Sequence, residues 1–306
     1  MKISLLQHHE VDKKRWDTVI RQSPHGLIYA YSWFLDAAAP GWYALVGDDY
    51  NYLMPLPVRT KWKLKYIYPP FFVQQLGIFS AAKCISAELT TAFLYAVNEH
   101  FRFAELYLHE KCTVISDSNF PSENRVNHLL PLQKNYESLN AAYSTQLKRN
   151  LKKANSTGAV IRSLNDVAAI IRLFRKSEAG RISNYRKADF SVFEKLIGEC
   201  MTRSMAEITG VFDTDGTLHG GAVFLKSHKR ITFIFSGMSR LARENSFLAF
   251  LLDDQIKKHS SSEMIFDFEG SMDKGLARFY KSFGSLETGY TFVTLNRLPK
   301  VIKWLK

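Results

Sequence analysis

The order of strands and helices predicted for the last hundred residues is the feature that most restricts how this chain can fold. Three apolar runs with strand character come first, and the turn signal Asp213-Thr-Asp-Gly216 joins the first two. An antiparallel meander that passes into helix-linked strands predicts a mixed α+β sheet. The predicted strands are 206–212, 222–226, 231–235, 264–268 and 289–295, and the predicted helices between them are 246–259 and 274–283.

The chain is long enough for two domains. Its 306 residues are about twice the length of a typical domain. A polar, turn-rich stretch over 116–125 and a short apolar strand over 128–132 precede a change in charge, so we expect a boundary near residue 135. The predicted domains are therefore residues 1–135 and 136–306.

Several classes of protein are disfavoured by what the sequence lacks. It contains neither GxGxxG nor GxxxxGK[ST], which disfavours dinucleotide-binding and P-loop chemistry. No run approaches 18 apolar residues and the first apolar stretch is short, so we expect neither a spanning helix nor an export signal. Three cysteines without CxxC spacing favour a reducing, cytoplasmic setting. The histidines form no HxxxH pair, so we predict no metal ion.

Positive charge is concentrated in one part of the chain. The formal net charge is +12, and residues 134–187 hold twelve Lys or Arg against three Asp or Glu, a net charge of +9. A basic excess of this size predicts a partner that carries phosphate groups. The charge therefore indicates where such a partner would approach.

A second basic segment lies in the first half of the chain. Arg59, Lys61, Lys63 and Lys65 alternate with uncharged residues, which predicts four cations on one face of a strand. Such a face is either a solvated edge that resists aggregation or a strip that contacts phosphate.

Four segments resemble one protein family. Residues 277–284 (ARFYKSFG) place a tyrosine four residues before a glycine, and residues 266–271 (FDFEGS) come just before them. Residues 146–154 (QLKRNLKKA) form a basic helical pattern, and residues 69–77 (PPFFVQQLG) are rich in proline. Together they resemble GNAT-type N-acyltransferases of the tandem-GNAT, FemAB-like group. The resemblance implies two GNAT-like domains, each a largely antiparallel mixed sheet flanked by helices, with acyl transfer in the second.

The resemblance also implies roles for two neighbouring residues. Tyr280 would give a proton to the leaving group, and Lys281 would stabilise the negative charge that develops on the acyl oxygen. Without such roles, Tyr280 would be a packing residue between two phenylalanines, and Lys281 a solvated cation at a helix C-terminus.

Two carboxylates lie in the preceding strand. Asp267 and Glu269 alternate with phenylalanines, so we expect both to project from one strand face, where they would deprotonate or position the amine. Acidic residues in an apolar strand need compensation, and a salt bridge to Arg278 or Lys274 is the structural alternative.

The segment that would bind the donor's phosphates departs from the family pattern. Residues 237–246 (GMSRLARENS) stand where GNAT proteins carry a glycine-rich pyrophosphate loop. We expect this loop to end at a helix N-terminus capped by Asn245, with Ser246, Arg240 and Arg243 close enough to bind an anion.

The basic helix offers a second phosphate site. Leu147 and Leu151 form one apolar stripe. The cations left on the polar surface are Lys148, Arg149, Lys152 and Lys153. These four residues would clamp a phosphate partner such as tRNA or a nucleotide-linked acceptor, would face an anionic membrane surface, or would only be solvated.

These observations lead to one expected function and one alternative. We expect an N-acyltransferase that moves an acyl or aminoacyl group from acyl-CoA or aminoacyl-tRNA to an amine, for instance on a cell-envelope precursor, without a tightly bound cofactor. The alternative is a GNAT-fold module that binds RNA or another phosphorylated ligand without catalysis, because the loop lacks glycines.

Overall fold

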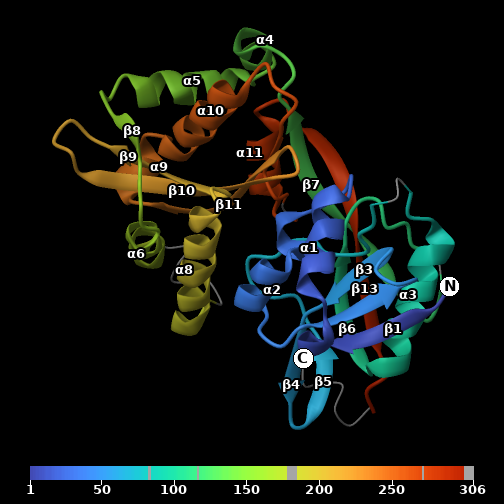
Figure 1. Ribbon diagram of the computed structural model, residues 1–306. Helices are drawn as coiled ribbons and strands as arrows, with labels where there is room; N and C mark the ends of the chain where they lie inside the picture. The colour runs from blue at the N-terminus through green and yellow to red at the C-terminus, as the bar shows by residue number, and fades with distance from the viewer. Residues whose placement is uncertain (82–83, 116, 178–184, 271, 300–306) are drawn as a thin grey trace. The chain divides into compact units, whose positions relative to one another are not determined.

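The computed structural model describes residues 1–81, 84–115, 117–177, 185–270 and 272–299 (Figure 1). Its internal contacts divide the chain into two compact units. Unit 1 comprises Met1–Arg125 and Gly289–Lys306, and unit 2 comprises Val126–Thr288. Strands β7 (Ser122–Pro131) and β13 (Leu286–Asn296) each begin in one unit and end in the other. We expected one boundary near residue 135 and did not expect the C-terminal strand to return to unit 1. It returns because β13 pairs with β6 (Phe103–Leu108).

Unit 1 contains two sheets. Strands β1, β2 and β3 form an antiparallel sheet, and the order of the other sheet in this unit is β4-β5-β6-β13. The core includes Phe93 and Val97 of α3 together with Leu106 of β6. The remaining elements are β1 (Ile3–Gln7), η1 (His8–Glu10), α1 (Lys13–Gln22), η2 (Ile28–Ala30), α2 (Ser32–Ala38), β2 (Tyr43–Gly47), β3 (Tyr52–Leu56), β4 (Val58–Lys61), β5 (Leu64–Ile67) and α3 (Ala87–His100).

The basic segment of unit 1 is a hairpin. Trp62 and Lys63 have φ values of 49° and 63°, so they form a two-residue turn between β4 and β5. Arg59 lies opposite Tyr66, whereas Lys65 lies opposite Thr60. The prediction that four cations share one strand face is therefore wrong, because the chain reverses in the middle of the pattern.

Unit 2 is built on a mixed sheet with strand order β7-β12-β11-β10-β9-β8. Among the pairs that these described strands form, β11–β12 alone is parallel. Figure 1 shows α5 and α10 on one face of strands β8–β11 and α6 and α8 on the other. The elements are α4 (Tyr136–Ala141), α5 (Thr145–Asn155), β8 (Val160–Ser163), α6 (Ala168–Lys176), α8 (Lys187–Thr202), β9 (Ala206–Phe212), β10 (Leu218–Ser227), β11 (Arg230–Met238), α9 (Arg240–Glu244), α10 (Phe247–His259), β12 (Ile265–Asp267) and α11 (Lys274–Lys281).

The core of unit 2 joins its sheet to the helices on one face. Phe224 of β10, Phe266 of β12 and Phe283 after α11 are fully buried in one cluster with Leu147 and Leu151 of α5. Phe266 and Phe283 both contact Phe268, with ring centroids 4.8 and 5.4 Å apart. Burial of aromatic rings of this size contributes strongly to folding, so the core fixes the end of β12 against α11.

None of the helices among the described residues is long and apolar enough to cross a bilayer.

Candidate acyl-transfer site

Strands β11 and β12 part inside the sheet of unit 2. They pair only from Arg230 to Thr232, where the last pair is Thr232 with Asp267, and β11 then continues to Met238. Along the neighbouring β10, the register skips Ile234, which is therefore an extra residue in β11. A β-bulge bends its strand and increases its local twist, and this one lies two residues after the last β11–β12 pair. We call this place, with Thr232 and Asp267 as its last pair, the fork.

A buried ion pair lies at the fork. Asp267 is 3% exposed, and its Oδ2 atom lies 2.6 Å from Nη1 of Arg230. The other oxygen accepts a hydrogen bond from the backbone N–H of Glu269 at 2.9 Å. The expected salt bridge to Arg278 or Lys274 is replaced by this one, because β11 places Arg230 beside β12. Both carboxylate oxygens of Asp267 are thus engaged in contacts that stabilise the local structure.

Glu269 leaves the strand. Its φ of 55° is left-handed, and β12 ends two residues earlier at Asp267. The prediction that Asp267 and Glu269 share one strand face is therefore wrong. Gly270 follows with a φ of 29°, and a Cβ atom there would lie 2.1 Å from the carbonyl oxygen of Val126. This sharp turn brings the negative charge of Glu269 close enough to Tyr280 to raise its pKa.

Tyr280 is buried in the last turn of α11. The helix begins at Asp273, whose side chain accepts a hydrogen bond from Leu276 N, and it carries Tyr280 to a position only 7% exposed. The ring centroids of Tyr280 and Phe268 lie 5.1 Å apart. Burial, and secondly the charge of Glu269, raise the pKa of Tyr280 above its ordinary value. Both effects disfavour the phenolate, so the hydroxyl keeps its proton until a stronger base forms beside it.

Lys281 lies next to Tyr280 but is half-exposed. Its Nζ atom lies 2.5 Å from Oε2 of Glu287. This pairing lowers the pKa of the Glu287 carboxyl. A contact between Lys281 and an acyl oxygen would therefore compete with Glu287.

His128 also lies at this site, and our sequence analysis missed it. It is fully buried on β7, where its carbonyl accepts a hydrogen bond from Phe268 N, and its ring centroid lies 6.0 Å from that of Tyr280. In the sequence, the one feature that could have indicated His128 was its position inside a short apolar strand. No motif marks it, because its partners come from α11 and the residues after it.

The segment expected to be a phosphate-binding loop contains a helix. Ser239 accepts a hydrogen bond from Ala242 N and begins α9. Asn245 does not cap the next helix, which corrects our prediction. Its Nδ2 atom donates to Leu241 O, and Ser246 takes the capping position of α10 with a φ of 59° and no side-chain cap. A helix forms here because Ser239, which belongs to the same segment, caps its first turn.

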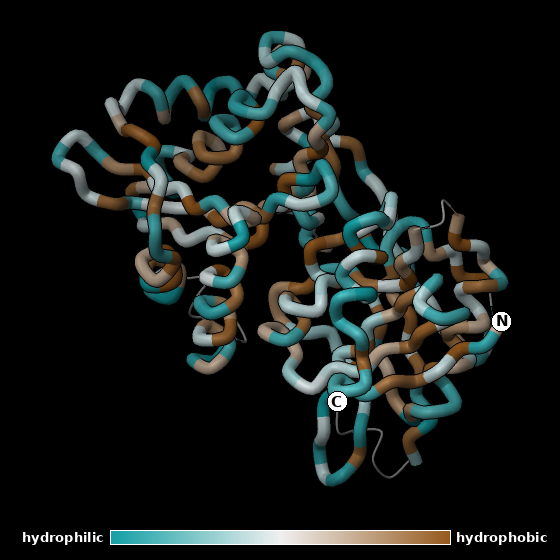
Figure 2. The backbone as a smooth tube through the Cα atoms, in the orientation of Figure 1, coloured by the Kyte–Doolittle hydropathy of each residue, from teal (hydrophilic) through white to brown (hydrophobic). Residues whose placement is uncertain are grey.

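The predicted cations of α5 and α9 are exposed, and α5 lies next to the end of α9. Lys153 Nζ donates to the carbonyl oxygen of Glu244 at 2.6 Å. Arg240 pairs with Glu244, and Arg243 donates to Met238 O. On α5, the apolar stripe is buried as predicted, and Figure 2 shows teal stretches alternating with brown along this helix. We call Lys148, Arg149, Lys152, Lys153, Arg240 and Arg243 the basic group.

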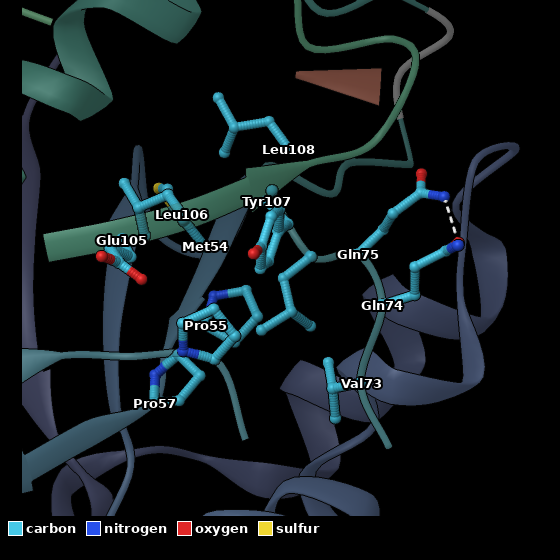
Figure 3. Close-up of a pocket in the computed structure, with 13 residues that line it drawn as sticks. Met54, Pro55, Pro57, Val73, Gln74, Gln75, Glu105, Leu106, Tyr107 and Leu108 are labelled. Carbon is cyan, nitrogen blue, oxygen red and sulfur yellow. Dashed lines mark hydrogen bonds between the residues drawn. The ribbon is translucent and has the colours of Figure 1, made fainter. Parts of the chain in front are cut away.

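Unit 1 contains a small pocket that none of these residues line (Figure 3). Its walls include the carboxylate of Glu105, the ring of Tyr107 and the aliphatic side chain of Met54. The space inside this partly open pocket is about 20 Å³, which holds roughly one water molecule. The pocket is therefore too small for a substrate. Across the described ranges, no three His, Cys, Asp or Glu side chains are grouped as metal ligands.

Comparison with known proteins identifies the family that part of unit 2 resembles. Residues 141–271 match the family model "Acetyltransferase (GNAT) domain". No curated protein matches the sequence. This match confirms the predicted resemblance to GNAT proteins over these residues.

The whole chain is similar to FemX, with a TM-score of 0.65 at 13% identity over 100% of both chains. A tandem GNAT protein from the clavulanic acid biosynthesis pathway matches with a TM-score of 0.54 at 11% identity, over 98% of this chain and 100% of that one. The C-terminal domain of a putative lysylphosphatidylglycerol synthetase from Agrobacterium fabrum matches with a TM-score of 0.56 at 12% identity, over 93% and 92%. These likenesses confirm the predicted fold class, a mixed α/β tandem GNAT fold.

Proposed function

We propose that the protein is an N-acyltransferase that moves an acyl or aminoacyl group from acyl-CoA or aminoacyl-tRNA to an amine acceptor. The observation that carries this proposal is the fork, where a tyrosine with a raised pKa lies beside the end of β12. The GNAT domain at 141–271 supports acyl transfer as the class of reaction. A precursor of the cell envelope is the acceptor we propose.

The reaction is a direct transfer. The amine attacks the thioester or ester carbon, and Lys281 or a backbone N–H stabilises the oxygen that becomes negative. Tyr280 gives its proton to the leaving sulfur or oxygen and takes up the proton that the amine loses, and Glu269 positions the amine. Asp267 acts as a positioning group, because both its oxygens already bind Arg230 and the backbone after β12.

The basic group would hold the phosphates of the donor. In α9 the first-turn N–H of Ala242 already donates to Ser239, so this N–H is not available to a pyrophosphate. The side-chain cations of the basic group remain available to bind phosphate, and one of them, Lys153, lies against the end of α9. Contacts made by Lys and Arg side chains suit the phosphates of either coenzyme A or tRNA.

A non-catalytic binding module is the second candidate. The observation that favours it is the capped helix α9 in place of a glycine-rich loop. Such a module would bind RNA or another phosphorylated ligand through the basic group without transferring an acyl group.

A ligand panel followed by a transfer assay separates the two. Acetyl-CoA, charged tRNA and a nucleotide-linked peptidoglycan precursor are each added at 100 times the dissociation constant, where a specific ligand adds about 2.7 kcal/mol to stability. We expect one donor to raise the melting temperature and to yield an N-acylated product. Stabilisation without product over many enzyme equivalents would favour the binding module, and no response to any ligand would overturn both.

A further inference from the structure

A chain of hydrogen bonds connects His128 to the helix that carries Tyr280. The Ser285 hydroxyl donates to the carbonyl oxygen of Tyr280 at 3.0 Å and lies 3.4 Å from Nδ1 of His128. A hydroxyl has one proton and a carbonyl can only accept, so the Ser285 proton belongs to the Tyr280 carbonyl. The Ser285 oxygen must then accept from Nδ1–H of His128.

This arrangement fixes the tautomer of His128. With the proton on Nδ1, the neutral ring has a lone pair on Nε2. In the described structure, Nε2 is fully buried and has no hydrogen-bond partner. A buried polar atom without a partner is costly, and where it persists it calls for a functional explanation.

The surroundings of His128 keep it neutral. Burial lowers its pKa, and the nearby Lys281 acts in the same direction, whereas Glu287 opposes them. Lys281 and Glu287 pair with each other, so their opposite charges largely compensate at the ring. The imidazole thus remains a base at pH values where an ordinary histidine begins to be protonated.

We propose that His128 is a further residue of the transfer site, one that accepts a proton through Tyr280 and returns it. The proposal rests on the proposed function. When the amine nitrogen bonds to the acyl carbon, it loses a proton to the Tyr280 oxygen, while the original Tyr280 proton moves to Nε2 of His128. When the bond to the leaving group breaks, that group takes the proton from Tyr280, and the imidazolium returns its own.

This relay conserves every proton and never requires a free phenolate. One proton passes from the amine to the leaving group, and both Tyr280 and His128 end as they began. The buried Nε2 atom needs no contact with substrate, since it acts through Tyr280. Hydrogen bonds of this kind are often long before substrate binds and shorten in the reacting complex.

The test compares His128→Asn with His259→Asn. The Asn amide can keep the hydrogen bond to Ser285 but supplies no base. His259 is the matched control, because it also has a buried, unpartnered Nε2 atom and a pKa lowered by burial, but lies near Lys226, Lys258 and Glu207. Transfer by each variant is measured between pH 4.5 and 9 with the donor that the panel identifies.

We expect His128→Asn to reduce kcat about 10²-fold with little change in donor KM. The wild-type rate should fall on the acid side as His128 becomes protonated, and this limb should disappear in His128→Asn but persist in His259→Asn. Combining His128→Asn with Tyr280→Phe should cost little more than either change alone, because the two residues act as a unit.

Two results overturn the relay alone: an active His128→Asn variant that keeps the acid limb, or additive losses in the double variant. A wild-type enzyme that transfers nothing overturns the proposed function and the relay with it. If His128→Asn does not fold, a long-range proton–nitrogen NMR spectrum of the wild type decides. The Nδ1–H tautomer is expected, and the Nε2–H tautomer would overturn the relay.

Discussion

Two parts of unit 2 were assigned to the site, and they differ in how their charges are held. Around the fork, Asp267 is 3% exposed and paired, and Tyr280 is packed among aromatic rings. The basic group is exposed, and the side chain of Arg240 is 88% accessible. Removing one partner of a buried ion pair lowers the stability of the fold strongly, whereas removing an exposed cation lowers it little. The fork is therefore held rigidly, as the proposed chemistry requires, and the basic group is accessible, as the proposed binding of phosphate requires.

The largest effect should come from Asp267→Asn. The substitution leaves the charge of Arg230 opposite a neutral amide in a buried place, so we expect unfolding to become easier by about 3 kcal/mol. Urea unfolding measures it, with Asp215→Asn in an exposed turn as the control, where about 0.5 kcal/mol or less is expected. A loss below about 1 kcal/mol for Asp267→Asn would mean that the fork does not depend on its ion pair.

Next in size is Tyr280→Phe. The ring is kept and the proton is lost, so we expect turnover to fall about 10²-fold, or about 2.7 kcal/mol in barrier, while donor affinity stays the same. Tyr143→Phe is the matched control, because Tyr143 is also buried and packs against Phe283. Equal turnover in wild type and Tyr280→Phe would remove Tyr280 from the chemistry.

A smaller effect is expected in the basic group. The double variant Lys148→Gln, Lys152→Gln removes two exposed cations of α5, and it should weaken binding of a tRNA donor. The slope of log K against log salt concentration should become shallower by about one for each lost contact. Titrations between 50 and 200 mM salt measure this slope. Lys61→Gln with Lys65→Gln, in the hairpin of unit 1, is the control. An equal loss of binding in both double variants would show that overall charge, and not α5, attracts the ligand.

The smallest effect on stability should come from Arg240→Gln. Its ion pair with Glu244 is exposed, and pairs of this kind contribute about 0.5 kcal/mol or less. Thermal unfolding should therefore hardly change, while donor binding weakens. A marked loss of stability would place Arg240 with the buried pairs of the fork.

The sequence was informative where one element determines the outcome. Period-2 and helical patterns predicted strands β9 to β12 and helices α10 and α11 in their observed order, although α9 was not predicted. The burial of Leu147 and Leu151 follows from their spacing alone. Tyr280 was named from a local motif within one helix. Each of these features depends on residues a few positions apart.

The features that were missed depend on contacts between distant segments or on single backbone angles. Arg230 lies 37 residues before Asp267, and His128 lies 152 residues before Tyr280, so no local pattern pairs them. The left-handed conformations of Trp62 and Lys63 divide a regular alternation into two strands. Likewise, Ser239 begins a helix in a segment whose composition indicated a loop.

Two glycines define what an engineer can change around the fork. A side chain at Gly237 would place Cβ 2.1 Å from the carbonyl oxygen of Ile170 in α6, and one at Gly270 would meet the backbone of β7 at the same distance. At both positions main chain lies directly against main chain, so no rotamer can relieve the overlap. A library of variants that tests the proposed donor site should keep both glycines and diversify the exposed positions of α5 and α9.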